Sequence, residues 1–262
     1  MRYASKIKKV TICGGHGRNG SKEAVDKIEL KMGNVLSIVG LTGSGKTALI
    51  NDIALFANRN TPSGRTVLIN DQIPTEEMQN PAMNPIALIT QHTNFLSDLP
   101  VKKFLETHIS VRQHGNPELA LKQTLDFANQ LTGEPILLQN AMTELSGGQS
   151  RALLIADAVI VCSSPIILLD EIENAGIYRT RALELLKQYK KIFVFVTHDP
   201  VIALLSDFRI IMQNGAMQKL IVTCEEEKEA VKEIKKLDDL LVRLRNKMRA
   251  GELLTKADLL LS

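Results

Sequence analysis

A glycine-rich stretch beginning at Gly40 has the residue types of a phosphate-binding loop. Gly, four residues and then Gly-Lys-Thr let backbone N–H groups approach phosphate oxygens, and the N-terminus of a following helix adds its dipole. Lys46 can place its charge on the β- and γ-phosphates, and the Thr47 hydroxyl can reach Mg²⁺. A chance glycine turn is the alternative, but an apolar run at 35–39 precedes the loop, as a strand should. The expected nucleotide-binding residues are Gly40, Leu41, Thr42, Gly43, Ser44, Gly45, Lys46 and Thr47.

Two carboxylates, Asp170 and Glu171, directly follow the apolar run 166–169. A carboxylate at the end of a buried strand can hold Mg²⁺, directly or through water. The carboxylate after it can accept a proton from an attacking water as general base. Two solvated carboxylates at a strand end are the alternative, and the phosphate-binding loop upstream argues against it. We therefore expect Asp170 to be a metal ligand and Glu171 the catalytic base.

A second glycine-rich stretch, Leu-Ser-Gly-Gly-Gln, occupies positions 145–149. It repeats the physics of the first loop, with a hydroxyl, a closely approachable backbone and a helix N-terminus. Ser146 also suits the N-cap of that helix, and the two interpretations are compatible. The stretch is therefore a second candidate anion-binding site.

The two loops together resemble the ATP-binding cassette (ABC) ATPases. In that family, two copies sandwich ATP between the first loop of one subunit and the LSGGQ of the other. The resemblance implies ATP and Mg²⁺ as cofactors and a homodimer or a heterodimer with a paralogue. It also implies which residues contact the nucleotide held by the opposite subunit. These are Ser146, Gly147, Gly148 and Gln149.

Three further positions follow the order of motifs in the family. Gln91 follows the apolar run 86–90 and resembles the glutamine that senses Mg²⁺ and the attacking water. His198 follows the run 193–196 and resembles the switch histidine that contacts the γ-phosphate. His16 lies where an aromatic residue usually stacks on adenine, and an ordinary loop residue is the alternative there. The resemblance thus implies that Gln91 and His198 join Glu171 in catalysis.

The resemblance covers roughly residues 7–222 and contains three departures. Ile172 stands where proline is usual after the catalytic glutamate. The segment 174–177, Asn-Ala-Gly-Ile, lacks the aspartate of the family's D-loop. Ser150-Arg151 is one residue shorter than usual before the arginine. The first two departures bear on communication between subunits and on the hydrolysis rate, and not on ATP binding.

Composition limits the possible partners and compartments. A net charge of +3 in 262 residues is too small to indicate a nucleic-acid partner, so none is expected. Cys13, Cys162 and Cys224 lack metal-binding spacing and fit a reducing compartment, with Cys162 expected to be a buried small hydrophobe. No stretch approaches the roughly 20 apolar residues of a membrane span. We therefore expect a cytoplasmic protein whose membrane-spanning partner, if it has one, is a separate chain.

Hydrophobic periodicity predicts alternating strands and helices, and the resemblance implies an α/β fold of the P-loop NTPase kind, with a mostly parallel sheet, an antiparallel β portion near the N-terminus and a helical subdomain. Expected strands include 35–39, 66–69, 86–90, 166–169 and 193–196, with a hairpin at 209–222. Expected helices include 47–58, two within 101–131, and one after the LSGGQ. The predicted domains are a nucleotide-binding domain at 1–222, with its helical subdomain at about 92–158, and a C-terminal extension at 223–262.

The C-terminal extension has a helical apolar stripe. Its members are Ala230, Ile234, Leu237, Leu241, Leu244 and Met248. A terminal helix packed on its own domain is the favoured interpretation, because fewer than three heptads are short for a coiled coil. A dimerising or partner-binding helix is the alternative.

Two functions remain open, because a fold does not decide the function grafted onto it. The first is the ATP-binding subunit of an ABC transporter, favoured by the full LSGGQ and the transporter-like stretch 91–105. The second is a soluble ABC ATPase that remodels or assembles a protein or cofactor partner, favoured by the altered D-loop and the terminal helix. We favour the transporter subunit.

Overall fold

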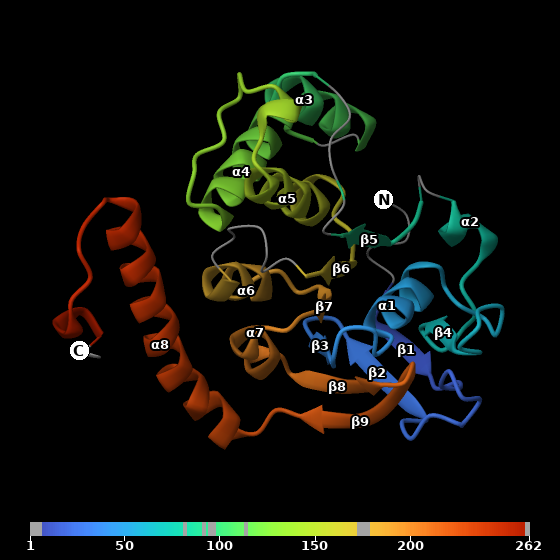
Figure 1. The fold of residues 1–262 in the computed structure, drawn as a ribbon. Helices are drawn as coiled ribbons and strands as arrows, with labels where there is room; N and C mark the ends of the chain where they lie inside the picture. Colours follow the sequence, from blue (N-terminus) through green and yellow to red (C-terminus); the bar gives the residue numbers. More distant parts are fainter. Residues whose placement is uncertain are drawn as a thin grey trace.

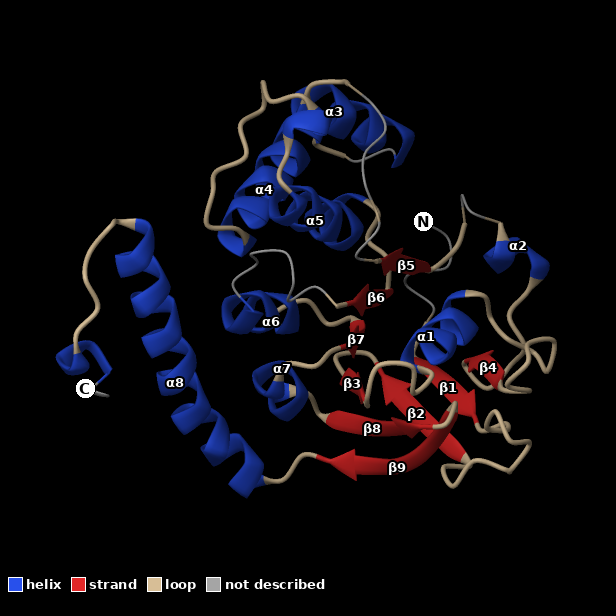
Figure 2. Cartoon of the chain, viewed as in Figure 1, coloured by secondary structure: helices blue, strands red, loops and turns tan. Residues whose placement is uncertain are grey.

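The computed structural model describes residues 7–80, 83–90, 93, 98–112, 115–171 and 179–259, with backbone alone at 179–181, 238 and 249. Within these residues the strands form two sheets, beside which the helices pack (Figures 1 and 2). The strands are β1 (Lys9–Cys13), β2 (Lys27–Lys31), β3 (Val35–Val39), β4 (Thr66–Ile69), β5 (Ile86–Ile89), β6 (Ile166–Asp170), β7 (Ile192–Val196), β8 (Phe208–Gln213) and β9 (Ala216–Val222).

The larger sheet has the strand order β5-β6-β7-β3-β8-β9. The pairs from β5 to β8 are parallel, and β8–β9 is antiparallel. Every residue of β6 and of β7 is buried, which explains why their sequences are almost entirely apolar instead of alternating. The predicted mostly parallel sheet is confirmed.

The smaller sheet is antiparallel, with the order β2-β1-β4. Residues of β2 alternate between exposed and buried, so only Ile28 and Leu30 face the core. This is the pattern of a sheet with one wet face. The predicted antiparallel portion near the N-terminus is therefore confirmed, and it lies beside α1 in Figure 1.

The helices lie outside the sheets (Figure 2). They are α1 (Lys46–Ala54), α2 (Glu76–Gln79), α3 (Val101–Arg112), α4 (Pro117–Leu131), α5 (Gly147–Ala156), α6 (Arg179–Lys187), α7 (Pro200–Leu205) and α8 (Glu225–Arg249). Short 3₁₀ turns cover Met142–Glu144 and Lys256–Leu259, and a π-helix covers Asp157–Val161.

Helix α1 ends earlier than its apolar pattern predicts, at Ala54 instead of position 58. Phe56 adopts a left-handed φ of 51°, and its N–H bonds Ile53 O at 3.2 Å. The N–H of Ala57 bonds Asp52 O at 2.9 Å. These two bonds form a Schellman cap, which closes the helix without a glycine.

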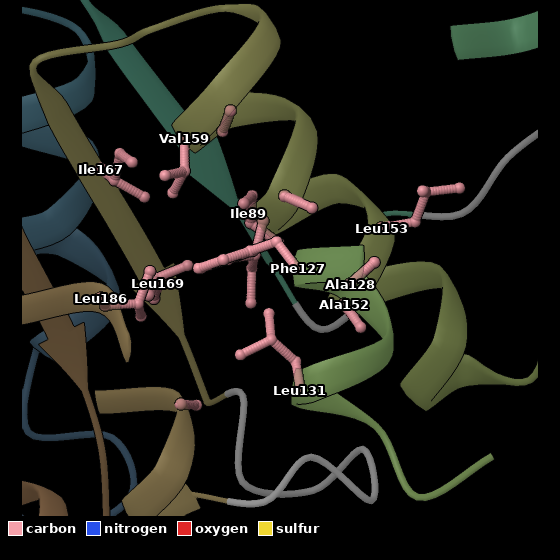
Figure 3. Packing of buried hydrophobic residues seen from close by; sticks show 14 of the residues in the cluster. Ile89, Phe127, Ala128, Leu131, Ala152, Leu153, Val159, Ile167, Leu169 and Leu186 are labelled. Atoms are coloured by element: carbon pink, nitrogen blue, oxygen red, sulfur yellow. The ribbon is translucent and has the colours of Figure 1, made fainter. Parts of the chain in front are cut away.

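Helices α3, α4 and α5 gather above one end of the larger sheet (Figure 1). Their apolar residues and those of β5, β6 and β7 belong to one continuous buried cluster. Phe127 of α4 extends toward Leu169 of β6 (Figure 3) and packs edge-on against Tyr189, with ring centroids 5.3 Å apart. The predicted boundaries of a helical subdomain and of the C-terminal extension stay predictions.

The first half of helix α8 contacts β8 and α6, and its second half contacts the C-terminal 3₁₀ turn through Lys247 and Asp258. Val231 is buried, Glu227 pairs with Arg209, and Lys235 pairs with Glu184 of α6. The second half extends past α6 (Figure 1), and its apolar stripe is exposed at Leu237, Leu241 and Met248. In the part of the chain that the structure describes, no helix is long and apolar enough to cross a bilayer.

Candidate functional site

The phosphate-binding loop joins the end of β3 to the start of α1, as its sequence predicts. Gly45 is the N-cap of α1 with a left-handed φ of 102°. A Cβ on Gly45 would lie 2.7 Å from Gly215 Cα, and a Cβ on Gly40 would lie 2.5 Å from Met212 O. Glycine is therefore required at both positions, because strand β8 lies against the loop at Gly40 and the β8–β9 turn lies against it at Gly45.

Polar groups of the loop point inward around its backbone. Lys46 Nζ donates to Gly40 O at 2.9 Å and to Leu41 O at 3.2 Å, and the residue is buried. Ser44 Oγ is buried and has no hydrogen-bond partner among the described residues. Thr47, on the first turn of α1, is exposed, as are Leu41, Thr42 and Gly43 at the loop tip. The loop thus offers an ammonium, two hydroxyls and backbone amides at a helix N-terminus, which suits a bound phosphate.

Asp170 and Glu171 lie at the carboxyl end of β6, as predicted. Asp170 is only 8% exposed and pairs with Val196 of β7. Glu171 has a left-handed φ of 50°, and its N–H bonds Val196 O at 2.9 Å. Such a backbone costs about 1–3 kcal/mol at a non-glycine residue and is concentrated at functional sites. The bond to Val196 of the neighbouring strand helps to hold Glu171 in that conformation, and its side chain is partly exposed.

His198 lies directly beside Glu171, although 26 residues separate them in the sequence. His198 Nε2 is 3.6 Å from Glu171 Oε1, and both side chains are partly exposed. The two residues follow neighbouring parallel strands, and β3, which leads into the phosphate-binding loop, pairs with β7. Glu171, His198 and the phosphate-binding loop therefore lie at the carboxyl edge of the sheet, where open α/β sheets bind their ligands.

The LSGGQ begins helix α5 with a complete capping box. Gln149 N donates to Ser146 Oγ at 3.3 Å, and Ser146 N donates to Gln149 Oε1 at 2.9 Å. Ser146 and Gly147 are exposed, and Gly148 is buried. Helix α5 belongs to the group above the sheet and lies apart from α1 (Figure 1). The interpretation of Ser146 as the N-cap is thus correct, and the N-terminus of α5 is exposed at Ser146 and Gly147.

His16 lies in an exposed turn between β1 and β2. Its N–H donates to Ser63 O at 2.7 Å, and its ring lies beside Gly64, where a Cβ would be 3.2 Å from Nδ1. The same turn meets the β8–β9 hairpin, because Arg18 N bonds Asn214 O at 2.9 Å. That hairpin touches the phosphate-binding loop through a 2.8 Å bond from Gly215 N to Ser44 O. Sequence reasoning missed this contact, since Asn-Gly signals only a turn.

The family comparison decides the class of protein. Residues 25–174 match the family model described as ABC transporter. An uncharacterised ABC transporter ATP-binding protein of Methanocaldococcus jannaschii is 46% identical over 255 residues, which cover 97% of each protein. The chain belongs to the ABC transporter family. It is an ATP-binding subunit of the ABC type, a family that hydrolyses ATP, and the resemblance drawn from its motifs is confirmed.

Further relatives and solved structures are less similar in sequence. The spermidine/putrescine import ATP-binding protein PotA of Borreliella afzelii is 28% identical over 220 residues, 80% of this chain and 60% of that protein. A dimeric ATP-binding cassette bound to ADP and phosphate has a TM-score of 0.61 at 20% identity, covering 82% of this chain and 99% of that one. The cbiO1 protein of Clostridium perfringens, part of an ABC transporter complex, has a TM-score of 0.61 at 21% identity, covering 95% and 100%. Because these two solved structures are only 20% and 21% identical to this chain, they show that it has the same fold and no more.

Some ABC positions lie outside the described residues. These are Gln91, Ile172 and the D-loop segment 174–177. Among the positions expected to form the nucleotide site, the structure describes the phosphate-binding loop, Asp170, Glu171, His198, the LSGGQ and His16.

A second polar cluster of the ABC chain lies between α3 and the π-helix. Ligand atoms of His108, Asp157 and Cys162 lie within 4.8 Å of one another, close enough for a metal ion. His108 Nδ1 is 3.2 Å from both oxygens of Asp157, and Cys162 Sγ donates to Asp157 at 3.4 Å. Arg112 faces both His108 and Cys162 and would repel a cation. We therefore interpret the cluster as an ion pair between His108 and Asp157, with the Cys162 thiol hydrogen-bonded to Asp157.

The expectation that Cys162 is a buried small hydrophobe is wrong, because its side chain is half-buried and its thiol donates to Asp157. Burial and the neighbouring Asp157 charge raise the pKa of Cys162 to about 12. The thiol therefore stays protonated at neutral pH and acts as a hydrogen-bond donor to Asp157.

Stability of the ABC fold should depend on His108. The hydrogen bond to Asp157 raises the pKa of His108 above its ordinary value, although burial and Arg112 oppose the shift. A raised pKa stabilises the fold fully below about pH 6.5, and this contribution is lost as pH rises through the folded-state pKa. In the wild type, the urea concentration at the midpoint of unfolding should fall between about pH 6 and pH 8 as His108 loses its proton, and His108→Gln should make that fall smaller. An unaltered slope would contradict the ion pair, and His16→Gln, in an exposed turn, is the matched control.

Proposed function

We propose that this ABC ATPase binds ATP with Mg²⁺ at the loop 40–47 and at the carboxyl edge of the larger sheet. Lys46 contacts the β- and γ-phosphates, and the loop amides donate to their oxygens. The buried Ser44 hydroxyl, which has no partner among the described residues, donates to the same phosphates. His16, in the neighbouring turn, contacts adenine.

The donor set fits Mg²⁺. The Thr47 hydroxyl and the Asp170 carboxylate are hard oxygen ligands, and Mg²⁺ prefers one or two such ligands plus phosphate oxygens. Gln91 is proposed as a further oxygen ligand on the resemblance alone. When bound, the ion offsets the charge of the β- and γ-phosphates.

Glu171 is the proposed general base, and its place 3.6 Å from His198 is the observation that carries the proposal. Glu171 accepts the proton of the water that attacks the γ-phosphorus, so that ADP and phosphate are the products. His198 contacts the γ-phosphate and orients Glu171. The backbone of Glu171, held in a left-handed conformation by the bond to Val196, keeps the carboxylate at the sheet edge.

The proposed working form is a head-to-tail dimer with a second copy or a paralogue. The exposed end of α5, with Ser146, Gly147, Gly148 and Gln149, closes on the γ-phosphate held by the other subunit. A dimeric cassette bound to ADP and phosphate has the same fold, which supports this arrangement. Binding of the γ-phosphate by both subunits shifts the population toward the closed dimer.

The proposed partner is a separate transmembrane subunit, with this chain on the cytoplasmic face of the membrane. Relatives whose names describe transporter ATP-binding proteins support it. The alternative, a soluble ATPase that remodels or assembles a protein or cofactor partner, is supported by the altered D-loop sequence and by the exposed apolar stripe on the second half of α8. The comparisons do not favour it.

Affinity capture tests the transporter role. Tagged Glu171→Gln protein is purified with ATP from detergent-solubilised native membranes, and its companions are identified by mass spectrometry. We expect one multi-span membrane protein in stoichiometric amount, because a cassette held closed keeps its partner. Capture with Lys46→Ala, which should not close, is the matched control. Soluble companions alone, with none from the membrane, would contradict the transporter role.

A further inference from the structure

A fully buried arginine lies behind the phosphate-binding loop. Arg65 directly precedes β4, and its side chain is 0% exposed. Its Nε and Nη2 donate to the two oxygens of Glu23 at 3.1 and 2.6 Å. Its Nη1 donates to Asp52 Oδ2 at 2.8 Å, and Nη2 also donates to Gly215 O at 2.8 Å. One guanidinium thus contacts three separate segments of the chain.

Each carboxylate extends this network. Glu23, also fully buried, accepts from Gly15 N at 2.8 Å and from Met217 N at 2.6 Å. Gly15 precedes His16, and Met217 belongs to β9. The Glu23 carboxylate therefore joins the His16 turn to the β8–β9 hairpin.

Asp52 joins the helix behind the loop to the same network. It lies on α1, and its Oδ2 also accepts from Ser63 Oγ at 2.8 Å. The neighbouring Ser63 O accepts the N–H of His16. The turn 61–64 is therefore tied both to α1 and to the His16 turn.

Gly215 passes the contact on to the phosphate-binding loop. Its carbonyl accepts from Arg65, and its N–H donates to Ser44 O at 2.8 Å. Its Cα is the atom that leaves no room for a Cβ on Gly45. A displacement of this one residue would therefore move the loop backbone at Ser44 and Gly45.

We infer that Arg65 is a positioning residue for nucleotide binding. Through its bonds to Gly215 and Glu23, it fixes the position of the phosphate-binding loop relative to the His16 turn. It touches no ligand itself. The inference rests on the proposed binding of ATP at the loop 40–47, with its adenine near His16. Because both ends of the nucleotide would depend on one guanidinium, Arg65 influences adenosine and phosphate contacts together.

Lysine cannot replace this arginine. The planar guanidinium makes its four hydrogen bonds at once because its N–H groups diverge in one plane. Although burial lowers it, the pKa of Arg65 is raised overall by the hydrogen bonds and charges of Glu23 and Asp52, so the side chain stays charged. A lysine keeps the positive charge but loses the diverging N–H groups of the guanidinium. Arg65→Lys therefore distinguishes the effect of hydrogen-bond geometry from the effect of charge.

The test compares Arg65→Lys with the wild type in binding MgATP and inorganic tripolyphosphate. Calorimetry is performed at a temperature at which circular dichroism shows both proteins to be folded. We expect the affinity for MgATP to fall about tenfold, and that for tripolyphosphate to fall less, since only ATP also needs the His16 turn. The matched control is Arg209→Lys, which alters a part-buried pair between Arg209 of β8 and Glu227 of α8.

Three outcomes separate the inference from its basis. A lower melting temperature with unchanged affinity for both ligands in folded Arg65→Lys would overturn it, because Arg65 would then be only structural. An equal fall for both ligands would overturn the part that concerns the His16 turn. Asp52→Asn, isosteric and missing one ion pair, replaces Arg65→Lys if that variant does not fold, with a smaller fall expected. Lys46→Ala that binds MgATP like the wild type would instead refute the binding site itself.

Discussion

Replacing Lys46 by alanine will abolish detectable ATP binding. The Lys46 ammonium is buried inside the loop and bonds the carbonyls of Gly40 and Leu41. The variant loses the charge that we propose to contact the phosphates and the two bonds to the loop carbonyls. Hydrogen bonds to charged groups contribute about 1.5–3 kcal/mol each, so we expect an affinity loss of about 100-fold or more. Isothermal calorimetry with MgATP measures it directly.

The control for Lys46→Ala is Lys228→Ala, which removes an exposed lysine paired with Glu225 on α8. That variant should bind ATP with unchanged affinity. Equal affinity of Lys46→Ala and the wild type would refute the assignment of the loop as the nucleotide site. Circular dichroism should show that both variants remain folded, because the loop lies at the surface at Leu41, Thr42 and Gly43.

Replacing Glu171 by glutamine will retain ATP binding and stop hydrolysis. The amide has nearly the shape of the carboxylate but cannot accept a proton from water. Loss of a general base lowers rates by about 10²–10⁴-fold, and phosphate release measures the change. Because ATP persists between the two subunits, the closed dimer should accumulate, which light scattering with and without ATP detects.

The control for Glu171→Gln is Glu184→Gln, at an exposed position on α6 that pairs with Lys235. Its hydrolysis rate should match the wild type. A Glu171→Gln protein that binds ATP and stays monomeric would contradict the head-to-tail dimer. A variant that hydrolyses ATP at the wild-type rate would instead remove Glu171 from the role of base.

Local signals in the sequence predicted most of the elements, because the physics that produces them is local. The runs 166–169 and 193–196 contain no polar residue, and only a strand buried on both faces tolerates that. Ser146 and Gln149 stand three positions apart before an apolar stretch, which is a capping box. The end of α1 could not be predicted in the same way, because Phe56 takes a left-handed conformation that usually needs glycine.

The sequence by itself determined the family and the mostly parallel sheet, and it predicted the phosphate-binding loop, because contiguous motifs encode them. Only the tertiary structure decided which distant residues meet. It brought His198 to Glu171 through the pairing of β6 with β7, and it buried Arg65 between Glu23 and Asp52. An arginine after a Pro-Ser-Gly turn is expected to be exposed, and only the packing of three other segments around it supplies the two carboxylates that make its burial favourable.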